Sequence, residues 1–390
     1  MSTLKVDSIE SRTSGNRIVF PDLNFLPPYR NILINGDMSA AQRGTSATSI
    51  DSTSQGYLTV DRWLHIQQAD DSNTGKTSMT QSTDVPSGQG FANSIKIDCT
   101  TAQTSISGTN SRVTVEQRLE GQQLQHLKKG TSNAESLTLS FWVKSSKTGT
   151  YICALRDVDN SRVISKSYTI NSANTWEKKT ITYEGDTTGA FDNDNARSLD
   201  VIWGLAAGSD YSSGTLQTTW GTISNANILV GQVNLMDSTS NEWYITGAQL
   251  EAGDSATPFE HLPIDVNLQR CFRYFYSMGG NASYEHFGIC SVTTTTDARG
   301  IIFLPVKMRT VPAIGQTGNF QLSGGSNSLT GTYSAGATMY FSISSFGGTQ
   351  NVGFDFWPGS AGTFANVNGA SYIIRANNST ATRVTFSTEL

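Results

Sequence analysis

The stretch SLTLSFWVKSS, residues 136–146, alternates apolar and polar side chains along its length. Every second position is apolar, through Leu137, Leu139, Phe141 and Val143. The intervening positions are mostly polar, so one face of an extended chain suits a core and the other suits solvent. Trp142 is out of phase, because it falls on the polar face. There it is either exposed or turned toward a partner subunit.

The same alternation recurs in short segments along the chain, including NSIKIDCT, GTYICALR, RVISKSYTI, WEKKTITYEG, SLDVIWGLAAG, NILVGQVNLM and EWYITGAQLE. Polar turn sequences such as DVDNS, EGDTTGAFDNDN and DSTSN separate several of them. Many short strands joined by polar turns predict an all-β fold, an antiparallel sandwich.

Helical signals are few. Leu124 and Leu127 are three apart before Gly130, which predicts one helical turn ending at that glycine. A second short helix is predicted in IDVNLQRCFRYFY, residues 264–276. Beyond it the chain is rich in Gly, Ser and Thr, with strand signals at residues 339–343, 372–374 and 384–386. We therefore expect a sandwich over 31–262 and a smaller β domain over 263–390, preceded by a thin segment over 1–30.

Composition excludes several classes of protein. The 390 residues are 37% hydrophobic and 15% charged, with a net charge of −5, so no basic surface for nucleic acid or anionic lipid is expected. The sequence shows neither a signal peptide nor a stretch that could span a membrane. We expect a soluble chain without membrane insertion.

Metal and catalytic motifs are also missing from the sequence. The four histidines stand alone and the four cysteines lack metal or redox spacing. Buried reduced thiols are expected, although a Cys271–Cys290 bond stays open. Asp192 and Asp194 suit either a calcium loop or a solvated turn. We predict no cofactor, no metal and no enzymatic activity.

Two tryptophans lie in loop-like sequence and are the candidate ligand contacts. Trp220 occurs in LQTTWGTISN and Trp357 in DFWPGS. Aromatic faces stack on sugar rings and also anchor protein interfaces, although most tryptophans of this chain are expected in the core.

A further stretch, YITGAQLEAGDSATPFEHLPIDVNLQRCFRYFY, residues 244–276, carries a resemblance to a known family. Its matching blocks are residues 245–251, 256–261 and 268–276, and others are NILINGDMSAAQRG, YLTVDRW, QRLEGQQLQHLKKGTSNAESLTLSFWVKS and TWEKKTITYEGDTTGA. Together they span roughly residues 31–276 and resemble bacteriophage tail-fibre and related virion proteins. Leu262 replaces the arginine usual in this family.

The resemblance implies a jelly-roll sandwich similar to carbohydrate-binding modules, in a homotrimeric fibre of the phage tail that is assembled in the host cytoplasm. It implies that residues 1–30 attach to other tail proteins, with the candidate contacts Leu4, Val6, Ile9, Ile18 and Phe20. The expected partner is host cell-surface polysaccharide, with the final domain distal.

The carboxylates of residues 244–276 suggest either an active site or a joint between domains, and we interpret them as a joint. Glu260 and His261 are expected to form a charge-assisted pair that fixes the linker. Two alternatives to an adhesin remain: a purely structural decoration, such as a head fibre or tail-tip component, and a glycan-degrading tailspike.

Overall fold

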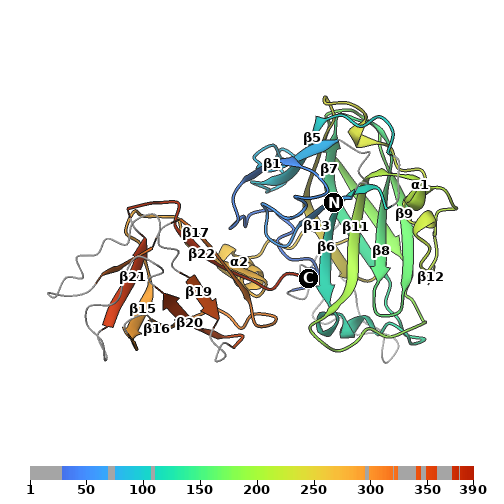
Figure 1. The fold of residues 1–390 in the computed structure, drawn as a ribbon. Helices are drawn as coiled ribbons and strands as arrows, with labels where there is room; N and C mark the ends of the chain where they lie inside the picture. Colours follow the sequence, from blue (N-terminus) through green and yellow to red (C-terminus); the bar gives the residue numbers. More distant parts are fainter. Residues whose placement is uncertain are drawn as a thin grey trace, which may run out of the picture.

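The computed structural model describes residues 29–68, 75–106, 110–294, 298–318, 320–323, 340–343, 348–357, 371–376 and 378–390. The predicted tail-attachment residues Leu4, Val6, Ile9, Ile18 and Phe20 lie outside this part of the chain. The described chain forms a large β-sandwich and a smaller β domain, joined near a short helix (Figure 1).

Two antiparallel sheets make up the sandwich. Sheet A has six strands, in the order β1 (Ser46–Ile50), β4 (Lys76–Ser82), β5 (Ser94–Thr101), β13 (Glu242–Ala252), β7 (Leu137–Ser145) and β10 (Glu177–Tyr183). Sheet B has seven, in the order β12 (Gly221–Thr222), β9 (Arg162–Ile170), β8 (Gly149–Asp157), β11 (Arg197–Ala207), β6 (Arg112–Glu120), β3 (Leu64–Gln68) and β2 (Gly56–Tyr57). Neighbouring strands often come from distant parts of the chain, as in a jelly roll. The predicted all-β sandwich is confirmed.

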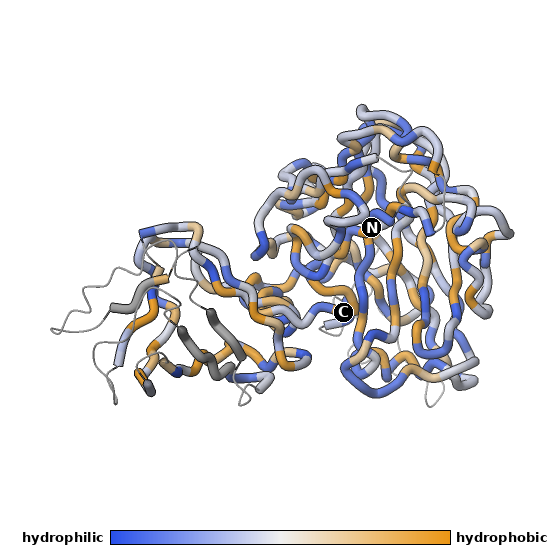
Figure 2. Tube along the Cα trace, in the orientation of Figure 1, coloured by the Kyte–Doolittle hydropathy of each residue, from blue (hydrophilic) through white to orange (hydrophobic). Residues whose placement is uncertain are grey.

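The core lies between the two sheets. The predicted apolar face of β7 is buried, and Phe141 makes an edge contact with Trp203 of β11 at 5.9 Å between ring centroids. Trp203 also packs on Trp63 at 5.3 Å. Hydrophobic and hydrophilic residues alternate along the sandwich strands (Figure 2). The period of two in the sequence is therefore the core pattern of the fold.

Two local predictions need correction. The sequence predicts a strand over residues 227–236, but the segment is a loop that runs from the end of the short turn η3 (Asn225–Asn227) into the short turn η4 (Leu235–Asp237). Ile228 and Leu229 are buried there against Ile152 on the outer face of sheet B, while Leu235 and Met236 belong to the sandwich core. The apolar residues of the segment are therefore buried without forming a strand. The predicted helical turn is a pair of 3-10 turns, η1 (Gly121–Gln123) and η2 (Gln125–Leu127), ending at Lys128 (φ 50°) before Gly130.

A buried histidine makes the stability of the sandwich depend on pH. The ring nitrogens of His65 lie 3.2 Å from the Thr114 carbonyl oxygen and 2.8 Å from Thr77 Oγ1. Burial lowers the pKa of His65 from 6.5 to about 4. The neutral ring therefore stabilises the fold fully above pH 6.5, and this contribution is lost as the pH falls toward 4.

We expect the unfolding free energy to fall by about 2 kcal/mol more in the parent protein than in His65→Asn between pH 7.5 and 5. Urea titrations of both proteins at each pH measure the difference, and the contributions of other groups cancel in it. Equal pH dependence in the two proteins would contradict the assignment.

The smaller domain follows the predicted short helix, α2 (Ile264–Phe272), which Pro263 precedes. Its first sheet is β14 (Phe275–Gly279), β22 (Arg383–Ser387) and β17 (Ala313–Thr317). The second is β18 (Phe320–Ser323), β21 (Ser371–Ala376), β15 (His286–Val292), β16 (Ala298–Phe303), β20 (Asn351–Trp357) and β19 (Tyr340–Ile343). All four cysteines are free and buried, and Cys271 and Cys290 belong to different apolar clusters.

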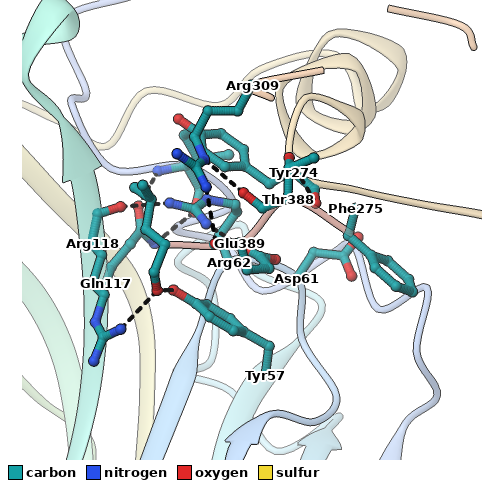
Figure 3. Close-up of polar contacts among 12 residues, drawn as sticks. Tyr57, Asp61, Arg62, Gln117, Arg118, Tyr274, Phe275, Arg309, Thr388 and Glu389 are labelled. Carbon is teal, nitrogen blue, oxygen red and sulfur yellow. Dashed lines mark hydrogen bonds and ion pairs between the residues drawn. The ribbon is translucent and has the colours of Figure 1, made fainter. Parts of the chain in front are cut away.

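The last residues of the sequence return to the sandwich, a feature that the sequence did not indicate. After β22, Glu389 forms an ion pair with Arg62, whose side chain is fully buried (Figure 3). The Arg62 guanidinium carbon also lies 3.5 Å from the ring centroid of Tyr274. The carbonyl oxygen of Leu390 accepts from Arg118 Nη1 at 2.7 Å. The smaller domain is thus held to the sandwich at both its beginning and its end.

Within the described residues no helix is long and apolar enough to cross a membrane.

Candidate functional site

A bulge in β13 shapes the outer face of sheet A. The register between β13 and β7 shifts between Thr246 and Gln249, and Gly247 has a positive φ of 59°. A Cβ at Gly247 would meet the Phe91 ring at 2.5 Å. Glycine is required here for two reasons, the left-handed backbone and the close approach of Phe91.

The loop that leaves β13 is fixed by hydrogen bonds to that strand. The Glu251 carboxylate accepts from Thr257 N at 2.9 Å and from Thr257 Oγ1 at 2.7 Å. Glu260 N donates to Gln249 Oε1 at 2.8 Å, and Asn31 N donates to the Glu260 carboxylate at 2.9 Å. Both carboxylates thus hold the exit loop and Asn31 in place.

The prediction that Glu260 and His261 pair with each other is wrong, because each side chain has other partners. Successive side chains of an extended segment point to opposite sides. Glu260 turns to the backbone of Asn31, while the His261 ring packs against Phe259 at 4.9 Å and Phe91 at 5.3 Å between centroids. Phe91 and Phe259 are themselves 5.1 Å apart, edge to face. The three rings form one wall above sheet A.

Trp142 lies across the sheet from this wall. In the strand register it stands between Thr246 of β13 and Lys178 of β10. Its side chain is half-buried on the outer face, which agrees with its out-of-phase position in the sequence. Opposite residues of neighbouring strands have Cβ atoms about 5 Å apart, so Trp142 and Lys178 are direct neighbours.

Between the wall and the sheet is a cavity of about 430 Å³. Its size is within the range of small-molecule sites, roughly 300–1,000 Å³. It is open to solvent and combines aromatic rings with amide, hydroxyl and cationic groups. Its lining residues are Gln89, Phe91, Ser140, Trp142, Lys178, Gly247, Ala256, Thr257, Pro258, Phe259 and His261.

The two predicted ligand contacts lie elsewhere. Trp220 is half-buried, packs against the sandwich core and donates from Nε1 to the Glu184 carbonyl oxygen at 2.7 Å. Trp357 is the last residue of β20, opposite Tyr340, and is not in a loop. The side chain of Trp357 lies outside the described part of the structure. The out-of-phase Trp142 was the sequence signal for the cavity.

No group of three or more His, Cys, Asp or Glu side chains suited to a metal ion occurs among the described residues. In the candidate calcium loop, Asp194 Oδ1 accepts from Ala196 N at 2.9 Å and the Asp194 carbonyl oxygen accepts from Gln122 N at 2.8 Å. These contacts belong to a turn that packs on η1.

No family model and no curated protein matches this sequence. Solved structures similar to the chain include the enzymatically active domain of tailspike protein 4 of bacteriophage CBA120, at 16% identity and a TM-score of 0.29, covering 58% of this chain and 22% of the tailspike chain. A family 4 carbohydrate-binding module has 11% identity and a TM-score of 0.29, covering 56% of this chain and 97% of that one.

The carbohydrate-binding module TmCBM61, solved with β-1,4-galactotriose, also has 11% identity and a TM-score of 0.29, and covers 57% of this chain and 99% of the module. At these identities and TM-scores the similarities carry no argument about ligand or activity.

Proposed function

We propose that this chain is a non-enzymatic virion protein of a bacteriophage, a homotrimeric tail fibre that binds a glycan of the host cell surface. Residues 1–30 attach it to the tail, and the cavity on sheet A receives the glycan. The observation that carries the proposal is this cavity, in which Trp142 and the wall of Phe91, Phe259 and His261 face polar groups. The resemblance of residues 31–276 to tail-fibre proteins supports the virion assignment.

The cavity is suited to binding and not to hydrolysis of a glycan. Cleavage of a glycosidic bond generally needs a pair of carboxyl groups beside the bond. No Asp or Glu is among the described residues that line the cavity. The aromatic faces can stack on sugar rings, while Gln89 and Ser140 can exchange hydrogen bonds with hydroxyl groups. Three copies in one fibre would strengthen a weak single-site affinity by avidity.

Binding of the full chain to an array of bacterial lipopolysaccharides and capsular polysaccharides tests the proposal. We expect Trp142→Ala to weaken binding to the recognised glycan at least tenfold, because it removes the aromatic platform. Trp220→Ala is the control, since Trp220 packs in the sandwich and lines no part of this cavity. Circular dichroism must show both variants folded.

Loss of binding in Trp220→Ala with full binding in Trp142→Ala would refute the assignment of the site. A folded parent protein that binds no glycan would favour a purely structural role. Sedimentation at micromolar concentration tests the trimer separately, and a monomer would count against a fibre.

A further inference from the structure

The cavity has at its edge a lysine without an ion pair in the described part of the chain. Lys178 is exposed at its edge, and within the described part of the chain its side chain has no ion pair or hydrogen bond. Of the lining residues only Lys178 and His261 are titratable basic groups, and none is acidic. Lys178 is therefore the charged hydrogen-bond donor that the lining itself offers to an anionic ligand.

Two carboxylates on elements around the cavity, those of Asp84 and Glu177, are already engaged by other groups. Asp84 binds Lys144 and accepts from Trp176 Nε1 at 3.0 Å. Glu177, the residue before Lys178, accepts from Lys179 Nζ at 2.6 Å and from Asn171 N at 2.9 Å. Lys178 thus remains available to a group brought by the ligand.

Two carboxylates of the exit loop, those of Glu251 and Glu260, are engaged in the same way, whereas the carboxylate of the exposed Asp254 accepts only from Ser255 Oγ at 3.1 Å among the described residues. Glu251 is bound by Thr257, and Glu260 by the backbone of Asn31, with Arg30 within 3.9 Å of Glu251 and 3.8 Å of Glu260. Neither carboxylate lines the cavity, although Thr257, which binds Glu251, does.

We infer that the cavity binds an acidic saccharide, a sugar residue with a ring carboxylate of the uronic or sialic type. This inference rests on the proposed glycan-binding function and adds the class of sugar. The ring stacks on Trp142, and the carboxylate accepts a hydrogen bond from Lys178 Nζ. The two side chains are cross-strand neighbours, which matches a ring with a carboxylate attached directly to it.

Matched pairs of polysaccharides test the inference with the full chain. The probes are uronic- and sialic-acid-containing capsular polysaccharides, each compared with the same polymer after its carboxylates have been reduced to alcohols. We expect the parent protein to bind the acidic form about tenfold more tightly, and Lys178→Gln to lose this preference. Higher salt should weaken binding of the acidic form only.

Two further variants make the result specific. Lys178→Arg keeps the charge and should retain most of the preference, whereas Lys307→Gln removes an exposed lysine outside the cavity and should change nothing. Equal binding of the acidic and reduced forms, or a preference for neutral glycans, would overturn the inference and leave glycan binding intact. Binding of no glycan in this panel or in the array would overturn both.

Discussion

Arg62→Met is expected to lower the unfolding free energy of the protein by about 3–5 kcal/mol, because it removes one partner of a buried ion pair. The Arg62 side chain is fully buried and that of Glu389 is 8% exposed. Burial alone would lower the pKa of Arg62, but the charge of Glu389 raises it above its usual value, so the guanidinium stays charged. Methionine fills part of the same space and leaves Glu389 without this counterion.

Urea unfolding followed by tryptophan fluorescence measures this loss, since Trp63 adjoins Arg62 and packs on Trp203 inside the sandwich. Lys128→Gln is a suitable control, because its ion pair with Glu135 is exposed and worth under about 1 kcal/mol. If Arg62→Met lowered the unfolding free energy by under about 1 kcal/mol, Glu389 would be solvated in solution and residues 388–390 would not dock on the sandwich as described.

The elements that could be predicted from the sequence are the strands in which apolar and polar residues alternate. β7, β9 and β11 follow directly from alternation, because each buries one face in the core. The segment over residues 227–236 is also rich in apolar residues, yet it is not a strand: Ile228 and Leu229 cover the outside of a sheet, and Leu235 and Met236 enter the core. Alternation reports burial, and burial is not specific to strands.

The candidate site is harder to predict because it depends on two exceptions to that alternation. The bulge at Gly247 and the out-of-phase Trp142 lie on different strands, about a hundred residues apart in sequence. Their proximity follows from the strand order, which local sequence does not encode. Trp220 was a reasonable candidate from its loop context, but its indole nitrogen is satisfied by the backbone of Glu184.

The docking of residues 388–390 on the sandwich had no signal in the sequence. Their removal should have a large effect on thermal unfolding. Deleting residues 388–390 removes the Glu389 ion pairs with Arg62 and Arg43, together with the hydrogen bond from Thr388 N to the Tyr274 carbonyl oxygen. We expect the two domains, which share these contacts in the full chain, to unfold in separate calorimetric transitions. The sandwich transition should move lower, since Arg62 loses its counterion. A single transition at the parent temperature would contradict this expectation.

The effects of Arg62→Met and of deleting residues 388–390 on the unfolding free energy should also be strongly coupled. This coupling is the sharpest test of the junction between the two domains. In the full chain Arg62→Met breaks a buried pair, but in the truncated chain the arginine already lacks its carboxylate. Replacing an uncompensated buried charge with an apolar side chain of similar length relieves desolvation. We therefore expect Arg62→Met to cost about 3–5 kcal/mol in the full chain and under about 1 kcal/mol, or to stabilise, after the truncation. Equal costs in both backgrounds would show that Arg62 acts through Tyr274 and the sandwich alone, and that the returning tail contributes nothing to its stability.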